Sequence, residues 1–123
     1  MKIAIPSMGE KMESKIDSRF GRAPYFFIGE SKDDLKAVAN KAIAANRGAG
    51  VSAAQVIVDE GVGAVIGVNF GPRAFWVLNE AKVELYQVGP ELTIAQALEE
   101  FLSGKLEKLA NPTGPGWQGK TNE

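Results

Sequence analysis

The chain has 123 residues, of which 45% are hydrophobic and 24% charged, and its net charge of −1 lacks the basic excess of a protein that binds nucleic acid through bulk electrostatics. It contains no cysteine and no histidine, which excludes disulfides, thiolate or imidazole metal ligands, Cys or His nucleophiles and a Ser-His-Asp triad. The first apolar run is too short for a signal peptide and no stretch approaches the ~18 apolar residues of a membrane span, so we expect a cytoplasmic protein with no membrane partner.

The first part of the chain is expected to contribute three strands. Residues 2–5 form a short β-branched run that ends at Pro6, and an aperiodic surface loop follows. Residues 25–28 are aromatic and β-branched, so they are expected to form a buried strand, with Pro24 at its first position. The composition of residues 35–40 allows a helix as easily as a strand. We predict a strand there, because this segment follows residues 25–28 closely and can pair with them as the second strand of a hairpin.

The next part of the chain alternates helix and strand. Apolar residues recur at helical spacing from Val51 to Val58, and Gly61 stands where a C′ glycine would end that helix. Residues 64–68 are apolar throughout, as in a strand covered on both faces. Pro72 suits the first position of a second helix.

The last predicted elements are a strand at residues 83–88 and a helix from 94 to about 103. Thr93 and Gln96 have the spacing of a capping box before that helix, and Gly104 lies just past its end. From residue 109 onward Asn, Pro, Gly, Thr and Lys dominate. We therefore expect one domain over residues 1–108 and a flexible tail over 109–123, in which the role of Trp117 stays open.

The predicted order is β-β-β-α-β-α-β-α. Two βαβ crossovers after an antiparallel opening indicate an α/β fold, a mixed sheet covered by helices. The carboxyl ends of the parallel strands then share one edge, where open α/β sheets bind ligands. Three segments are expected to meet there: residues 6–22, 48–50 and 69–73.

Arg19 and Arg22 lie on either side of Gly21 in the first of these segments, just before a rigid strand. Two guanidinium groups fixed on one loop suit an oxyanion or another anion. The alternative is that one or both arginines only pair with nearby carboxylates such as Asp17, and for either arginine alone the two interpretations are equally weighted.

Glycines open both helices at this edge: Gly48 and Gly50 before the first, and Gly71 before Pro72 in the second. Free N–H groups and the helix dipole favour an anion at such positions, and glycine lets a ligand approach the backbone. The glycines match neither a P-loop nor a dinucleotide fingerprint, and the alternative is that they only supply the turn that starts a helix.

Nothing in the sequence indicates catalysis or a metal site made of carboxylates. The spacing of the acidic residues does not favour metal ligation, and no acid–base pair with a supporting partner is visible. We therefore predict no catalytic residues, no metal ligands and no enzymatic activity.

Three motifs occur in an order that resembles the dinitrogenase iron-molybdenum cofactor biosynthesis domain family, over about residues 1–106. They are Asp-Ser-Arg-Phe-Gly-Arg-Ala-Pro-Tyr-Phe at residues 17–26, Gly-Ala-Gly at 48–50 and Gly-Pro-Arg-Ala-Phe at 71–75. The resemblance implies a ribonuclease H-like fold, a five-stranded mixed sheet in the order 3-2-1-4-5 with strand two antiparallel. It does not imply nuclease activity, because strand one supplies no carboxylate.

The function implied by the resemblance is that of a carrier, which binds an anionic iron- or molybdenum-sulfur cluster or its precursor and passes it to cofactor-assembly or acceptor proteins. By position, the implied binding residues are Arg19, Arg22, Gly48, Gly50, Gly71 and Pro72. Some relatives are thought to anchor the cluster through His or Cys, which this chain lacks, so a cluster would be held as an outer-sphere anion. The alternative is a regulatory or interaction domain that binds a small anionic metabolite or a protein partner without metal.

Overall fold

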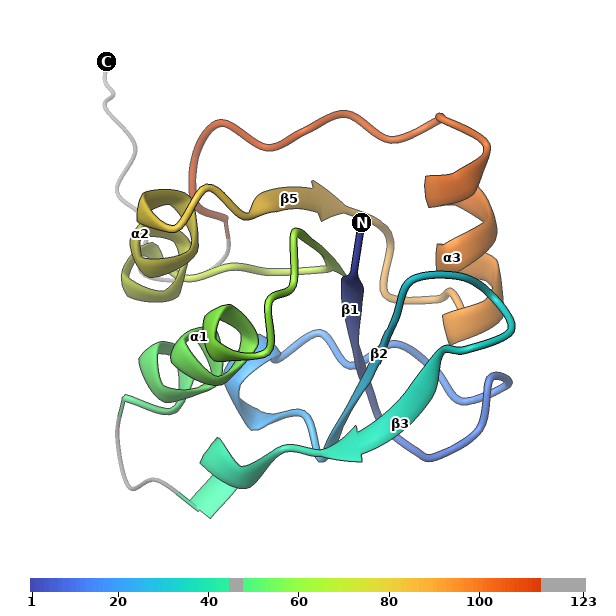
Figure 1. Cartoon of the computed structure of the whole chain (residues 1–123), viewed down its shortest axis with the longest axis horizontal. Helices are drawn as coiled ribbons and strands as arrows, with labels where there is room; N and C mark the ends of the chain where they lie inside the picture. Colours follow the sequence, from blue (N-terminus) through green and yellow to red (C-terminus); the bar gives the residue numbers. More distant parts are fainter. Residues whose placement is uncertain (45–47, 114–123) are drawn as a thin grey trace.

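The computed structural model describes residues 1–44 and 48–113 (Figure 1). The strands are β1 (Ile3–Ser7), β2 (Tyr25–Gly29), β3 (Lys36–Ala39), β4 (Ala64–Gly67) and β5 (Glu84–Gln87). The helices are α1 (Ala49–Asp59), α2 (Pro72–Glu80) and α3 (Ile94–Leu102), with short 3-10 turns η1 (Phe20–Arg22) and η2 (Lys41–Ala44). Residues 35–40, for which a helix and a strand were equally compatible with the composition, contain β3.

The five strands form one mixed sheet in the order β3-β2-β1-β4-β5. β2 is antiparallel to both of its neighbours, and β1, β4 and β5 run parallel. The expected α/β fold, its strand order and its antiparallel second strand are thereby confirmed. β1 is the central strand in this order.

β1 continues through Pro6 to Ser7, so the expectation that it ends at Pro6 is wrong. Proline is excluded from central strands because it cannot donate to the ladder. Here β4 pairs only with Ile3 and Ala4, so Pro6 lies beyond that neighbour and pairs with β2 alone. The Pro6 carbonyl is still used, since it accepts a 3.0 Å hydrogen bond from the Asp17 N–H.

Alternating residues of the strands form two apolar layers. Ala4, Phe26, Val65 and Leu85 pack with α1 and α2 on one face of the sheet. Ile3, Ile5, Phe27 and Ile66 pack with α3 on the other. Figure 1 shows α1 and α2 together on one side and α3 on the opposite side. Both faces of the sheet are therefore covered, as expected for parallel strands with crossover helices.

The helix ends follow the signals in the sequence. Gly61 has a φ of +78°, in the left-handed region that favours glycine after a helix. Pro72 is the first residue of α2, and Thr93 and Gln96 form both hydrogen bonds of a capping box. Within the part of the chain that the structure describes, no helix combines the length and apolar character needed to cross a membrane.

The first residues of the expected tail are bonded to the body of the protein. The Leu109 N–H donates to the Leu85 carbonyl at 2.7 Å, and the Thr113 N–H donates to the Phe70 carbonyl at 2.8 Å. Pro112 is buried. Trp117 and the rest of residues 114–123 lie outside the described residues.

Candidate functional site

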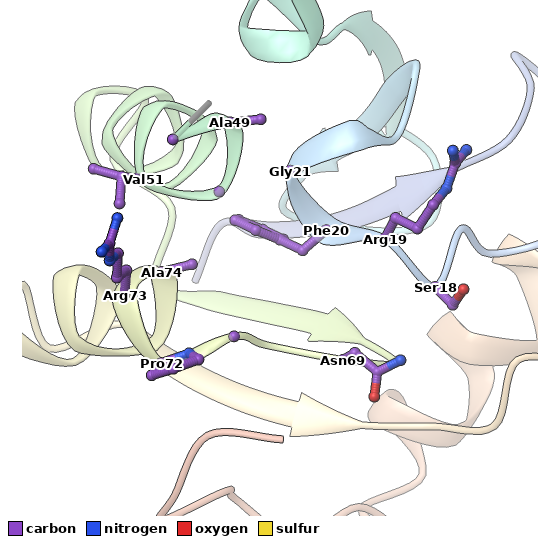
Figure 2. A pocket seen from close by; sticks show the side chains of 13 residues that line it. Ser18, Arg19, Phe20, Gly21, Ala49, Val51, Asn69, Pro72, Arg73 and Ala74 are labelled. Carbon is purple, nitrogen blue, oxygen red and sulfur yellow. The ribbon is translucent and has the colours of Figure 1, made fainter. Parts of the chain in front are cut away.

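The three segments expected at the carboxyl edge of the sheet meet around one cavity of about 510 Å³ (Figure 2). The segment after β1 contributes residues 18–21, the start of α1 contributes 48–51, and the segment after β4 contributes residue 69 and residues 71–74. Arg19 and Asn69 form an isolated parallel β-bridge, which joins the first and third segments directly. Crossover topology therefore gathers residues that are far apart in sequence.

Phe20 holds η1 against the sheet and forms part of the cavity wall. Its side chain is buried, and its ring lies 5.3 Å from that of Phe26 and 5.7 Å from that of Phe70. Close-packed aromatic rings restrict one another's movement. The segment that carries Arg19 is thus anchored by an apolar side chain beside it.

Gly21 brings η1 directly onto the backbone of α1. A Cβ atom at this position would lie 2.5 Å from the Gly50 nitrogen and 2.7 Å from the Ala49 carbonyl carbon. Only glycine permits such an approach without a shift of the backbone. The contact fixes the first turn of α1 relative to the arginine segment.

Asn40 joins η1 to η2 from within the protein. Its buried side-chain amide donates to the Ala23 carbonyl at 2.8 Å and to the Gly21 carbonyl at 3.2 Å. Its side-chain oxygen accepts from the Ala42 N–H at 3.0 Å. One buried side chain therefore forms hydrogen bonds with main-chain groups of two turns that flank the cavity. Leaving such buried polar groups without partners would cost stability.

The N-termini of α1 and α2 both line the cavity. Gly48 precedes α1 with a φ of +75°, and Gly71 precedes α2 in an extended conformation. Neither glycine has a side chain to cap its helix, and the first N–H groups of a helix have no partner within it. The partial positive charge of both dipoles therefore favours an anion in the cavity.

Arg19 lines the cavity but is paired with Asp17. Its Nε and Nη2 atoms donate to the Asp17 carboxylate at 3.0 and 2.9 Å, and its N–H donates to the same group at 2.9 Å. These hydrogen bonds and the charge of Asp17 raise the pKa of Arg19. In Figure 2 its guanidinium points away from the other lining side chains. The ion pair weighed as an alternative in the sequence is present.

Arg22 does not line the cavity. Its Nη1 atom donates to the Ile43 carbonyl in η2 at 3.0 Å. The structure thus brings together five of the six sequence-predicted binding residues, namely Arg19, Gly48, Gly50, Gly71 and Pro72. Arg22 is directed to the neighbouring turn.

Arg73 is a lining residue that was not singled out from the sequence. It lies in the first turn of α2 and is exposed. Figure 2 shows its guanidinium extending toward Val51 on α1, between the two helices. The position of Arg73 directly after the Gly-Pro pair is the sequence signal that could have identified it as a lining residue. Ser18 and Asn69 also line the cavity and were not predicted individually.

The cavity combines two helix N-termini and the Arg73 guanidinium with a largely apolar wall. Its apolar lining residues are Phe20, Ala49, Val51, Pro72 and Ala74. Within residues 1–44 and 48–113, no group of three or more acidic side chains is placed to hold a metal ion. The arrangement suits an anion bound through N–H groups and a guanidinium rather than a bare cation.

Comparison with known proteins identifies a family model that matches most of the chain. The profile described as "Dinitrogenase iron-molybdenum cofactor" matches residues 1–104. An uncharacterized protein of Methanocaldococcus jannaschii is 32% identical over 113 residues, which cover 89% of this chain and 92% of that protein.

Two solved structures have the same fold. The apo form of the orange protein from Desulfovibrio gigas superposes with a TM-score of 0.86 at 32% identity, covering 92% of this chain and 96% of that one. A putative NifB protein from Thermotoga, assigned to the DUF35 family, gives 0.78 at 35% identity and covers 94% and 98% of the two chains. With its profile matched over most of its length, the chain belongs to the dinitrogenase iron-molybdenum cofactor family.

Proposed function

We propose that the protein is a non-enzymatic carrier that binds an anionic metal–sulfur cluster, or a precursor of one, in the cavity between η1, α1 and α2. The observation that carries the proposal is the convergence of two helix N-termini and Arg73 on a largely apolar cavity. Family membership supports iron–molybdenum cofactor chemistry as the context.

The apolar wall favours an anion with sulfide on its surface. A strongly hydrated oxyanion loses many hydrogen bonds on entering a cavity, and each lost bond must be replaced by a donor. Phe20, Val51 and Pro72 offer none from their side chains. A thiometallate is larger and more weakly hydrated, so apolar contact with its sulfur atoms costs less.

Binding in this proposal is outer-sphere, because the sequence contains no cysteine and no histidine. Soft thiolate ligands, which normally anchor iron–sulfur clusters, have no counterpart here. The cluster would therefore arrive with its own sulfide ligands complete and be held by charge and N–H groups. No covalent bond would have to break on transfer to an assembly or acceptor protein. The proposal places this exchange in the cytoplasm.

The same absence of cysteine and histidine favours a second candidate function. In this alternative the cavity binds a small anionic metabolite without metal and acts in regulation. The two candidates differ in the ligand surface that the cavity prefers, sulfide or oxygen.

Paired titrations with tetrathiomolybdate and molybdate test the proposal. Both ions are tetrahedral dianions, so only the exchange of sulfur for oxygen differs between them. We expect tetrathiomolybdate to bind at least about tenfold more tightly, a difference of ~1.4 kcal/mol, and its affinity to fall as salt rises.

Equal affinities for the two ions, or a preference for molybdate, would favour the metabolite alternative. Anaerobic purification followed by metal and sulfide analysis gives an independent check. A protein that binds neither dianion and never takes up iron or molybdenum with sulfide would remove the carrier proposal.

A further inference from the structure

The segment after α3, residues 105–113, is here called the C-terminal strap. It runs from the α3 side of the sheet across β5 to the α2 side (Figure 1). Lys108 forms an antiparallel β-bridge with Tyr86, and the Leu109 N–H donates to the Leu85 carbonyl at 2.7 Å. The strap therefore covers the outer edge of β5.

Apolar side chains attach the strap on both faces of the sheet. Leu106 packs against the buried cluster on the α3 face, and Leu109 packs against the cluster on the α1–α2 face. Pro112 is buried. The route of the strap is thus determined by packing before it reaches Thr113.

At its end, Thr113 pairs with both main-chain groups of Phe70. The Phe70 N–H donates to Thr113 Oγ1 at 2.8 Å, and the Thr113 N–H donates to the Phe70 carbonyl at 2.8 Å. Phe70 is fully buried, so these groups would otherwise need other partners in a place without easy access to water. Thr113 therefore determines how the Phe70 main chain is held.

Phe70 lies between two cavity-lining residues, Asn69 and Gly71. Its ring contacts Phe20 on the opposite wall, and its chain leads directly into the first turn of α2. The Arg73 and Ala74 N–H groups lie in that first turn. Thr113 is thus bonded to the residue between two lining residues, without lining the cavity itself.

We infer that Thr113 is a positioning residue for the anion-binding cavity, and that attachment of the C-terminal strap and occupancy of the cavity are coupled. The inference rests on the proposed function for the identity of the ligand. Coupling between two sites is reciprocal, so an anion in the cavity also strengthens the attachment of Thr113.

The test compares Thr113→Val, which keeps the shape but loses the hydroxyl acceptor, with Thr113→Ser, which retains it. Leu35→Ala, a substitution of a buried residue directly before β3 at the opposite edge of the sheet from β5, serves as the matched control for a general loss of stability. Affinity is measured by titration with tetrathiomolybdate. Amide hydrogen exchange at Phe70, Arg73 and Ala74 is measured with and without that ion.

For Thr113→Val we expect about three- to tenfold weaker binding, the loss of one hydrogen bond's net contribution. Amide exchange at Arg73 and Ala74 should be faster even in the ion-free protein. Thr113→Ser and Leu35→Ala should bind within about twofold of the parent, well under the tenfold that one hydrogen bond can contribute. In the parent, the ion should slow exchange at Phe70.

Unchanged exchange at Arg73 and Ala74 in ion-free Thr113→Val would overturn the inference, whatever the ion does. Unchanged affinity in that variant would overturn the coupling even if exchange accelerates. If the parent binds no tetrathiomolybdate while exchange in the variant accelerates, the proposed function fails and the positioning role of Thr113 is supported.

Discussion

The buried carboxylate of Asp17 accepts two hydrogen bonds from the guanidinium of Arg19, at 2.9 and 3.0 Å, beside the cavity. The Asp17 side chain is 3% exposed, whereas that of Arg19 is 63% exposed. One charge of the arginine segment is therefore already neutralised, and Asp17 adds negative charge next to a cavity that we propose binds anions.

Asp17→Asn should weaken folding and strengthen anion binding. The variant keeps one oxygen acceptor but loses the charge-assisted pair, so its melting temperature should fall by a few degrees, as expected for ~1 kcal/mol in a domain of this size. Tetrathiomolybdate should bind a few-fold more tightly at low salt, and the gain should disappear at high salt because screening shortens the reach of charges.

Asp59→Asn, at the far end of α1, removes the same formal charge and is the matched control. It should change the affinity much less. If Asp17→Asn binds tetrathiomolybdate more weakly than the parent, the Asp17–Arg19 ion pair is needed to hold the binding site in shape.

Arg73→Gln should reduce affinity for tetrathiomolybdate by about tenfold, the lower range for a hydrogen bond to a charged group. Arg73 lines the cavity, whereas Arg22 donates to Ile43 outside it. Arg22→Gln should therefore leave affinity nearly unchanged and mainly lower the melting temperature.

Titration of both variants at low and high salt checks this ordering. A larger loss of affinity in Arg22→Gln than in Arg73→Gln would restore Arg22 as a binding residue, as the sequence predicted. The salt dependence of binding should be smaller in Arg73→Gln than in the parent.

Gly21→Ala and Gly50→Ala should have opposite effects on stability. An added Cβ at Gly21 would lie 2.5 Å from the Gly50 nitrogen, so the backbones must separate, at a cost of roughly 1–3 kcal/mol. An added Cβ at Gly50 would meet the Ala74 side chain at 3.4 Å, an ordinary contact, and alanine favours a helix by roughly 0.5–1 kcal/mol over glycine.

Thermal unfolding of the two variants measures the difference directly. We expect a clear drop in melting temperature for Gly21→Ala and a small rise for Gly50→Ala. A similar drop in both would show that the first turn of α1 tolerates no added side chain on either side.

Asp34 should contribute to the pH dependence of folding. Hydrogen bonds from the N–H groups of Ser31 and Glu30 lower the pKa of its carboxyl group. A carboxyl whose pKa is lower in the folded state stabilises the protein above its unfolded pKa of ~3.9. That stabilisation is lost as the pH falls through the lowered folded value.

Asp34→Asn should therefore be less stable than the parent at neutral pH, and the difference should shrink as the pH is lowered below about 4. Urea unfolding at a series of pH values measures it. The adjacent Asp33→Asn is the control for loss of one charge. If the stability difference between Asp34→Asn and the parent stays constant across the acid range, Asp34 does not contribute to the pH dependence of folding.

Much of the fold follows from local signals that the sequence displays. Gly61 and the Thr93–Gln96 pair mark helix ends through backbone conformation and capping, which depend on few neighbours. The continuation of β1 through Pro6 could not be predicted, because it depends on where β4 stops pairing. The local sequence pattern carries no information about how many residues of β1 pair with β4.

The candidate site was predictable as a meeting of three segments, because parallel strands place their carboxyl ends at one edge. The direction of individual side chains was not. Arg19 and Arg22 look equivalent in the sequence. Arg19 pairs with Asp17, two residues away, whereas a tertiary contact directs Arg22 to the Ile43 carbonyl. The attachment of Thr113 to Phe70 was also missed, since a breaker-rich segment gives no sign of a distant main-chain partner.

The order of the cavity segments along the chain has a consequence for synthesis. Every lining residue lies between residues 18 and 74, and the C-terminal strap reaches Phe70 only at Thr113. On the ribosome the cavity walls therefore emerge well before the groups that pair with the Phe70 main chain. If Thr113 positions the cavity as we infer, full affinity for the anion is reached only after the C-terminal strap has been synthesised and attached to Phe70.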